Sequence, residues 1–268
     1  MTDLTIGIAT CGRPRVLMRL LRSLNKNAGM DYKLKILDNT PAFTDDKKAY
    51  ADHNKFPKYA EVIYWDKKIG CCESNNILAD ACETEYFMHM DDDVVVTDEN
   101  IIKNMFNLIK DKEYPTIIGG TWYDTFYNRY RHQCMKYLFG INDDFPTVKK
   151  YPIPYEFTKQ FKYDLIQTDE CLHSMIMRKD DIYDLVRWDE KFKWKGDRLD
   201  FFLQCDRKDI ALFTYCKQQF THSPEKFHYG SLSYEDFGGE EAIDYFKEKW
   251  GIFPIVGWAN KQIKPGNI

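Results

Sequence analysis

Residues 86–96, YFMHMDDDVVV, place Asp91, Asp92 and Asp93 between two apolar runs that favour buried β-strand. A run of like charges costs free energy wherever it is desolvated, so this cluster needs a cation to neutralise it. We expect a divalent metal, because Mg²⁺ and Mn²⁺ prefer oxygen ligands and keep positions for substrate phosphates. A plainer interpretation stays open: the aspartates form a solvated turn that stops a strand, and Asp98 caps the following helix.

The segments around this stretch alternate between strand and helix patterns. Apolar runs predict strands at residues 4–10, 34–40, 61–65, 86–90 and 115–120. Apolar residues at helical spacing predict helices that begin near Pro14, in GCCESNNILADACE and near Asp98. Strands that alternate with helices form a mostly parallel sheet covered on both faces, so we expect an α/β protein with a Rossmann-like sheet.

Polar residues follow three of the predicted strands. Thr10, Asp38 and the aspartates at 91–93 each come where a strand ends. In open parallel sheets, ligands bind beyond the carboxyl ends of the strands. We therefore expect these side chains to line one crevice.

Length and charge restrict the class of protein. The chain has 268 residues and a formal net charge of -4, which suits one large α/β domain or two small ones and argues against a general nucleic-acid binder. No apolar run approaches the roughly 18–20 residues that span a bilayer, and the N-terminus is unlike a signal peptide. We expect a cytoplasmic protein, with peripheral membrane contact left open and the oligomeric state undetermined.

The eight cysteines contain no CxxC pair, and Cys71 and Cys72 are adjacent. In a chain without an export signal, this usage predicts reduced, mostly buried thiols. A structural zinc site is not expected.

Residues 120–165 break the alternation of strands and helices. The stretch is aromatic, basic and proline-bearing, so it predicts hairpins and loops. Trp122, Tyr123 and Tyr127 are candidates for stacking on sugar faces, but packing of a small second sheet is the interpretation that we favour for most of these rings.

The C-terminal region contains a polar stretch, HSPEKFHYGSLSYEDFGG, followed by one amphipathic helix. The polar stretch is a candidate mobile loop that closes over substrate. Tyr245, Phe246 and Trp250 lie on or near one face of the helix. We expect this helix to dock on the domain or to act as a lid.

Four blocks follow one another along the chain: TIGIATCGRPRVLMRLLRSL, LKILDNT, GCCESNNIL and YFMHMDDDVVV. With these blocks in this order, the chain resembles inverting glycosyltransferases of the family 2 type with the GT-A fold. The segment WDEKFKWKGDRLDFFLQCDRKDIAL is similar to the acceptor-side block of that family. The resemblance covers roughly residues 4–222. It implies a mostly parallel Rossmann-like sheet flanked by helices, with a smaller antiparallel acceptor-side region.

The resemblance also implies a division of the chain. Residues 1–222 would form one catalytic domain, with a nucleotide-sugar half (1–119) and an acceptor-binding, base-bearing half (120–222). Residues 223–268 would form the C-terminal loop and helix packed on that domain, a possible lid.

Metal ligands follow from the same resemblance. Asp91 and Asp93 would be the carboxylates of the DxD motif, with Asp93 the better candidate for direct ligation and Asp92 either assisting or facing solvent. His222 falls where relatives often place a third metal ligand. A hydrogen-bonded loop histidine is the open alternative for His222.

Donor contacts are implied at four further positions. Asp38 matches the residue that contacts the nucleoside, usually uridine, and Thr10 and Arg13 lie in the loop that touches the nucleotide. Lys68, with its neighbour Lys67, is a candidate for the phosphates. The open alternatives are a capping role for Asp38 and solvated side chains for Arg13 and the lysines.

The catalytic base is expected in Gly196–Asp200, where relatives often carry GEDxD and this chain has arginine in place of the middle acid. A GEHxDFFLR-type subset, which includes enzymes that add β-linked N-acetylgalactosamine, resembles GDRLDFFLQ more closely. Inversion requires a carboxylate that takes the acceptor proton, and Asp197 and Asp200 are the candidates. We favour Asp197, because Asp200 falls in a first helical turn, where it would complement the helix dipole. Arg198 would hold the acceptor or neutralise an acid.

Together these features predict a metal-dependent inverting glycosyltransferase that uses Mn²⁺ or Mg²⁺. It would move a hexosyl or N-acetylhexosaminyl group from a nucleoside-diphosphate sugar, UDP-linked in the first instance, to a hydroxyl of a glycan, lipid-linked or other acceptor. Two alternatives stay open: a sugar-nucleotide nucleotidyltransferase, although ATCGRPR holds one glycine where a triphosphate loop would be glycine-rich, and a non-catalytic carbohydrate- or nucleotide-binding module.

Overall fold

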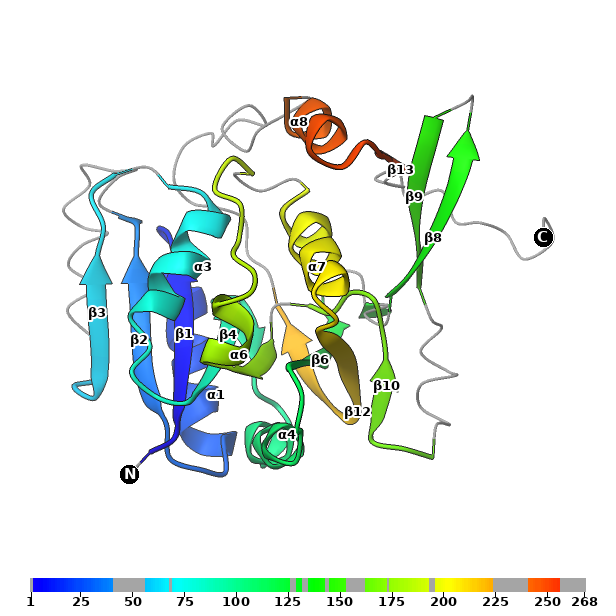
Figure 1. The fold of residues 1–268 in the computed structure, drawn as a ribbon. Helices are drawn as coiled ribbons and strands as arrows, with labels where there is room; N and C mark the ends of the chain where they lie inside the picture. Colours follow the sequence, from blue (N-terminus) through cyan, green and yellow to red (C-terminus); the bar gives the residue numbers. More distant parts are fainter. Residues whose placement is uncertain are drawn as a thin grey trace.

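The computed structural model describes residues 2–40, 56–67, 69–125, 129–131, 135–142, 145–152, 162–172, 174–192, 196–223 and 241–255. Two sheets contain the described strands, a large central one and a small one of three strands (Figure 1). Among the described residues, no helix is both long and apolar enough to cross a bilayer.

The N-terminal half of the central sheet is parallel, as the alternating pattern predicted. Its strands are arranged in the order β3-β2-β1-β4. Their bounds are β1 (Leu4–Thr10), β2 (Lys33–Asp38), β3 (Ala60–Tyr64) and β4 (Tyr86–Asp91). Because these strands run in one direction, their carboxyl ends meet at one edge of the sheet.

The other half of the central sheet is mixed. β11 lies antiparallel between β4 and β6, β12 runs parallel to β6, and β10 lies antiparallel on β12. Two short strands, β5 and β7, pair with β12 and β6. The bounds are β5 (Val94–Val95), β6 (Thr116–Asp124), β7 (Arg129–Arg131), β10 (Leu165–Gln167), β11 (Met175–Arg178) and β12 (Ala211–His222).

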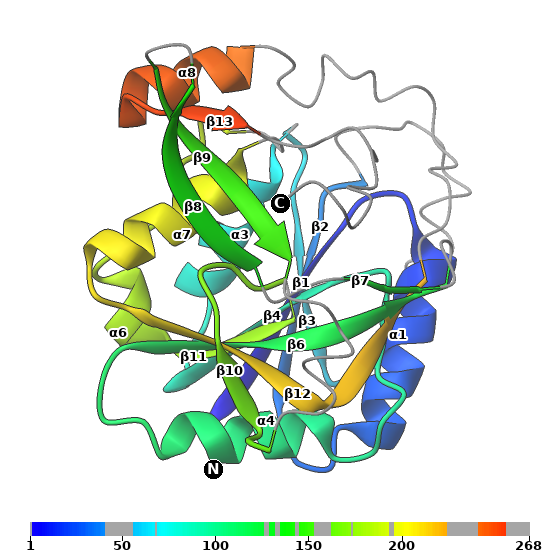
Figure 2. The ribbon, with the colours of Figure 1, turned by 90° about the vertical axis from the view of Figure 1, so that its right-hand side faces the viewer.

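Helices cover both faces of this sheet and bury two separate cores (Figures 1 and 2). α1 (Pro14–Asn27) and α4 (Ile101–Lys110) bury their apolar sides in one core. α3 (Cys71–Asp80), α6 (Lys179–Tyr183) and α7 (Asp197–Arg207) contribute to the other. In β1 the side chains of Leu4, Ile6 and Ile8 all belong to the α1 core, the period of two that a strand covered on both faces requires.

The small sheet and α8 lie beyond the carboxyl edge of the central sheet (Figure 1). β8 (Met135–Asn142) and β9 (Phe145–Pro152) form an antiparallel hairpin, and β13 (Phe253–Ile255) runs parallel to β9. α8 (Glu241–Trp250) buries Phe246 and Trp250 among residues of α7. The described part of residues 120–165 thus contains an antiparallel hairpin, and α8 packs against α7.

The structure excludes two of the alternatives that were left open for single residues. Asp98 does not cap α4: Asn100 is the N-cap residue, and the Asp98 carboxylate accepts a hydrogen bond from the backbone N–H of Gln219. Trp122 is not a sugar platform, because it lies in β6, is 3% exposed and donates its indole N–H to Ser174. Tyr127 and the loop at residues 224–240 lie outside the described residues.

Candidate active site

The polar residues that follow the parallel strands lie side by side at the carboxyl edge. In the strand register, Thr10 of β1 pairs with Asp38 of β2, and Ala9 pairs with Asp91 of β4. Three strand ends therefore meet where the pattern predicted a crevice. The structure brings Thr10, Asp38 and the acidic loop at residues 91–93 to one place.

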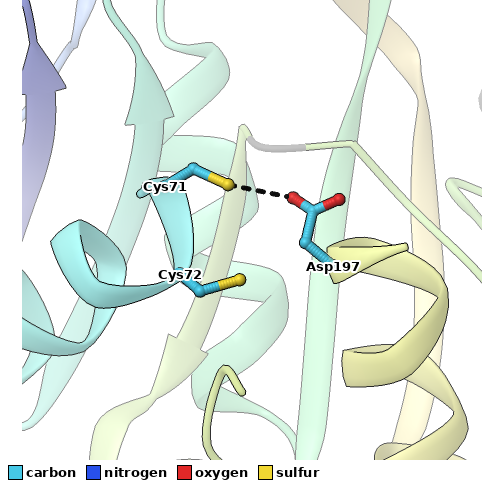
Figure 3. Close-up of side chains that lie close together, drawn as sticks. All are labelled: Cys71, Cys72 and Asp197. Carbon is cyan, nitrogen blue, oxygen red and sulfur yellow. Dashed lines mark hydrogen bonds between the residues drawn. The ribbon is translucent and has the colours of Figure 1, made fainter. Parts of the chain in front are cut away.

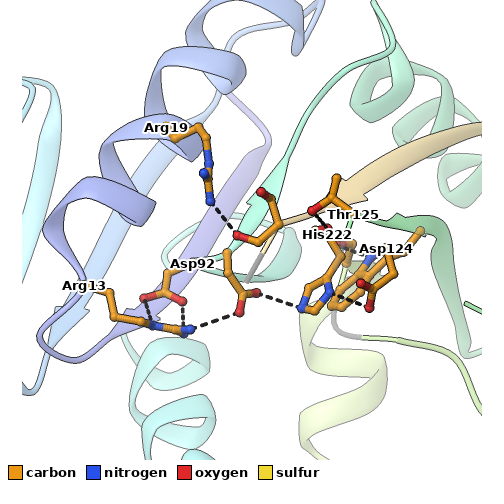
Figure 4. A network of polar contacts seen from close by, with 10 residues as sticks. Arg13, Arg19, Asp92, Asp124, Thr125 and His222 are labelled. Atoms are coloured by element: carbon orange, nitrogen blue, oxygen red, sulfur yellow. Dashed lines mark hydrogen bonds and ion pairs between the residues drawn. The ribbon is translucent and has the colours of Figure 1, made fainter. Parts of the chain in front are cut away.

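Asp92 is neutralised by the protein itself. Its carboxylate is 1% exposed and accepts hydrogen bonds from Arg13 Nε at 3.2 Å and from Thr10 Oγ1 at 2.7 Å, and Arg13 Nη2 contacts its other oxygen (Figure 4). Burial raises the pKa of Asp92, an effect that the Arg13 guanidinium opposes. Asp92 thus neither faces solvent nor belongs to a solvated turn, because both of its oxygens are held in a buried ion pair.

Asp93 lies between Arg13 and His222. Arg13 Nη1 donates to Asp93 Oδ2 at 3.0 Å, and Asp93 Oδ1 lies 3.5 Å from His222 Nε2. On the other side of the imidazole, His222 Nδ1 lies 3.0 Å from Asp124 Oδ2 (Figure 4). Trp122 stacks on the ring, with centroids 4.8 Å apart. Each ring nitrogen of His222 therefore faces one carboxylate, Nδ1 that of Asp124 and Nε2 that of Asp93.

Backbone contacts fix this arrangement. β5 pairs with the end of β12, and the Ser223 N–H donates to the carbonyl of Asp93 at 2.9 Å. Arg19 Nη2 donates to the Ser223 carbonyl at 2.5 Å, and Thr125 donates through its backbone N–H and its hydroxyl to the His222 carbonyl. The imidazole and the acidic loop are consequently held in register by two strands and by α1.

The donor set of Asp93 and His222 fits a divalent cation. A carboxylate oxygen and an imidazole nitrogen aimed at each other are ligand types that first-row divalent metals accept, and the Asp124 contact orients the imidazole as second-shell carboxylates do. Asp91, at the end of β4, is half-buried beside them. Asp92 does not fit, because its oxygens are engaged by Arg13 and Thr10.

Asp38 organises the loops at the ends of β1 and β2. It is fully buried, and its Oδ1 accepts a hydrogen bond from the Thr40 N–H at 2.9 Å. Thr40 Oγ1 in turn accepts from the Gly12 N–H at 2.7 Å. The Asn39 amide donates to the carbonyl of Lys67. Asp38 therefore has the capping role weighed above; contact with a nucleoside stays a prediction for this residue, as it does for Thr10 and Arg13. Lys68 lies outside the described residues.

The two candidate bases on α7 have different surroundings. Gly196 precedes the helix with φ of 81°, a left-handed conformation that suits glycine, and the helix begins at Asp197. Asp197 is 7% exposed, with a 3.3 Å hydrogen bond from Cys71 Sγ to Oδ2. Asp200 is fully buried and accepts hydrogen bonds from Trp250 Nε1 and Gln204 Nε2 at 2.8 Å each, with Lys249 Nζ at 2.7 Å. Asp200 joins α7 to α8, whereas Asp197 lies at the open end of the helix.

Arg198 lies between the two acidic regions. Its Nε is 3.9 Å from Glu170. Burial lowers the pKa of Arg198, but Glu170, Asp197 and Asp91 outweigh burial and raise it. Arg198 is the second residue of α7 and follows Asp197 directly, so its guanidinium brings a positive charge to the start of that helix. Of the two roles expected for Arg198, its position beside Glu170 agrees with the neutralisation of an acid.

Sequence reasoning missed three of the residues that complete this site. Asp124 ends β6 and orients His222, but a lone aspartate at the end of a predicted strand gave it no special pattern. Glu170 is 2% exposed. It accepts a hydrogen bond from the Tyr137 hydroxyl at 2.8 Å and forms an ion pair with Lys150. Lys249 reaches Asp200 from α8. Their partners are distant in sequence, so no local pattern could have identified them.

Comparison with solved structures shows which known folds this architecture resembles. The fold is similar to that of GalNAc-T7 in its structure with UDP, GalNAc and Mn²⁺, with a TM-score of 0.63, 13% sequence identity and 92% of this chain covered. It is also similar to S. aureus TarS 1-349 in complex with UDP-GlcNAc, with a TM-score of 0.61, 14% identity and 93% coverage. The chain spans 50% of the GalNAc-T7 chain and 66% of that TarS chain. A sequence comparison with curated proteins found no match.

This mixed sheet, flanked by helices, together with the similar structures, shows that the chain has the GT-A fold. The model of glycosyl transferase family 2 matches residues 5–186, more than half of the chain. The chain therefore belongs to glycosyl transferase family 2.

Proposed function

We propose that this protein is a metal-dependent, inverting glycosyltransferase that uses a UDP-linked sugar and transfers it to a hydroxyl group of a glycan, lipid-linked or other acceptor. The observation that carries the proposal is the pair Asp93–His222, backed by Asp124, at the carboxyl edge of the sheet. Membership of family 2 supports the reaction class.

Residues 1–119 would bind the donor. Thr10, Arg13 and Asp38 lie beside one another at the ends of β1 and β2 and would surround the nucleotide. Asp93 and His222, with Asp91 at their side, would hold Mn²⁺ or Mg²⁺. When bound, that ion neutralises charge on the departing diphosphate. Both similar structures were solved with uridine nucleotides, which supports a UDP donor and an N-acetylhexosamine as the first sugar to test.

Residues 120–222 would bind the acceptor and carry the base. Asp197 would accept the proton of the acceptor hydroxyl as that oxygen attacks the anomeric carbon, on the face opposite the diphosphate. Asp200 is held by Lys249, Trp250 and Gln204, so we assign it to positioning α7 rather than to the base role. Arg198, which follows Asp197 in α7, would place a positive charge beside this base. The C-terminal helix would fix the start of this block through Asp200.

The test is a panel of sugar nucleotides with Mn²⁺. We expect UDP-linked N-acetylhexosamines to raise the thermal midpoint in a metal-dependent manner and to be hydrolysed slowly in the absence of an acceptor. Stabilisation by nucleoside triphosphates, but not by sugar nucleotides, would indicate a nucleotidyltransferase. Binding without turnover over a broad set of acceptors would indicate a binding module.

A further inference from the structure

Two thiols and one carboxylate converge where α3 and α7 begin (Figure 3). Cys71 and Cys72 are the first two residues of α3, and Asp197 is the first residue of α7. One ligand atom from each lies within 4.8 Å of the other two, and Cys71 Sγ is 3.3 Å from Asp197 Oδ2. Cys72 and Asp197 are buried and Cys71 is half-buried. These side chains thus form a compact cluster with one partly open side.

We propose that Cys71, Cys72 and Asp197 bind a thiophilic divalent cation, Zn²⁺ in the first instance, at a site separate from Asp93 and His222. Thiolate sulfur selects zinc and related soft ions over Mg²⁺ and Mn²⁺, which prefer oxygen. Two sulfur ligands of a tetrahedral zinc ion are about 3.8 Å apart, given Zn–S bonds of about 2.3 Å. The spacing of the cluster is therefore close to the spacing that one ion requires.

The electrostatic surroundings favour a cation with anionic ligands. The N-termini of two helices stabilise negative charge on the thiolates and on the carboxylate. Three carboxylates, Asp197, Asp200 and Asp189, all act on Cys72 and attract a positive ion. A hydrogen bond with Cys72 and burial raise the pKa of Cys71. In the absence of a metal the thiol of Cys71 accordingly carries a proton, which zinc displaces when it binds.

A disulfide between the two cysteines is a poor alternative. Consecutive Cα atoms are about 3.8 Å apart across a trans peptide, whereas disulfides join Cα atoms about 4.4–6.8 Å apart. Both cysteines also lie in a regular helix. Metal binding needs no change of backbone conformation. The absence of a CxxC pair excluded only the usual structural zinc motif.

Occupation of this site would inhibit the enzyme, a consequence that rests on the proposed function. Asp197 is the proposed base, and a zinc ion bound to its carboxylate takes the lone pair that would accept the acceptor proton. Mn²⁺ at the oxygen-rich site would stay in place. The cluster would therefore make transfer sensitive to free zinc.

Binding is tested with Cd²⁺ and Co²⁺ on the metal-free full-length protein. We expect one ion per chain to produce a thiolate-to-metal charge-transfer band, which an excess of Mn²⁺ does not remove. Cys71→Ser and Cys72→Ser should each weaken binding by at least about 100-fold. Cys216→Ser, which changes a half-buried thiol on β12, should leave the band unchanged. X-ray absorption at the cadmium edge of the unmodified protein should show two sulfur ligands. Because this measurement uses no variant, it does not depend on whether the variants fold. Absence of the band and of sulfur ligation would overturn the site.

Inhibition is tested by Zn²⁺ titration of Mn²⁺-supported donor hydrolysis. Relative to its own zinc-free rate, each cysteine variant should require at least about 100-fold more Zn²⁺ for half inhibition. Asp93→Ala should lose hydrolysis and keep the cadmium band. If the cadmium charge-transfer band is present but no preparation hydrolyses a donor, the soft-metal site would be supported and the proposed transferase activity would be contradicted. Equal zinc inhibition of the unmodified enzyme and the cysteine variants would overturn the inhibitory role.

Discussion

The acidic loop at residues 91–93 and the acidic start of α7 each contain two acids that have different partners. Each holds one carboxylate in a closed set of partners and leaves another accessible to chemistry: Asp92 and Asp93 in the loop, Asp200 and Asp197 in the helix. Asp92 is held by Arg13, the residue that directly precedes α1, whereas Asp200 is held by α8 from the C-terminal region. The loop is thus part of the sheet's own construction, and the start of α7 depends on a helix added later in the chain.

This contrast shows that neighbouring acids in one motif are separated by their distant partners. A buried carboxylate whose two oxygens are both engaged by partners within the protein is unavailable for ligation. Asp93 also accepts a hydrogen bond from Arg13 through Oδ2, but its Oδ1 faces His222 at the proposed metal site. The motif supplies both acids, and the fold decides which acid has which role.

The largest effect should come from Asp93. Asp93→Ala removes a ligand of the proposed metal site, so we expect the kcat of Mn²⁺-supported donor hydrolysis to fall by at least about 100-fold. Asp92→Asn should instead lower the thermal midpoint and keep the dependence on Mn²⁺, because Asp92 is enclosed by Arg13 and Thr10. Asp111→Ala, at the exposed end of α4, is the control. Loss of Mn²⁺ dependence in folded Asp92→Asn, with Asp93→Ala active, would reverse the assignments in this loop.

The two acids of α7 should separate in the same manner. Asp197→Asn should lower kcat by about 10²- to 10⁴-fold, the contribution of a general base, with little change in the free energy of unfolding. Asp200→Asn should lower that free energy by about 1–3 kcal/mol, because it weakens buried contacts with Lys249 and Trp250. Denaturant unfolding and donor hydrolysis on the same preparations measure both. A stable Asp200→Asn protein without activity would transfer the base role to Asp200.

A smaller effect is expected behind the metal ligands. Asp124→Asn keeps the size of the side chain but weakens its hold on His222 Nδ1, so we expect Mn²⁺ affinity to fall by about 10- to 100-fold. Saturating Mn²⁺ should restore most of kcat. Electron paramagnetic resonance of free Mn²⁺ measures the affinity. Thr125→Ala, which removes a hydroxyl contact with the His222 carbonyl but keeps the backbone hydrogen bond, should change the affinity little. Unaltered Mn²⁺ binding in Asp124→Asn would remove His222 from the proposed ligand set.

Sequence patterns predicted the parts of this molecule that depend on local or periodic order. The parallel strands and the helices between them follow from runs of apolar residues, and the meeting of Thr10, Asp38 and Asp91 follows from strand direction. The pairing of Arg13 with Asp92 did not follow, because the aspartate cluster pointed to a metal as its cation. Asp124 and Lys249 were missed because their partners, His222 and Asp200, are distant from them in the sequence. Such contacts depend on how strands and helices pack, which composition and spacing do not encode.

The smallest effect should come from the tryptophan that joins α8 to α7. Trp250→Phe keeps an aromatic ring in the core but removes the N–H that donates to Asp200 Oδ1 at 2.8 Å, so the free energy of unfolding should fall by about 1 kcal/mol. Tyr245 lies on α8 as well, and Tyr245→Phe removes the hydroxyl that donates to Asp189. This variant serves as the matched control. Because Asp200 positions α7 and Asp197 carries the proposed chemistry, kcat should stay within about twofold in Trp250→Phe, a change of less than 1 kcal/mol in the activation barrier. A fall in kcat larger than the loss of stability would mean that α8 acts on the reacting groups, and the distinction between a held acid and an available acid would then fail at the start of α7.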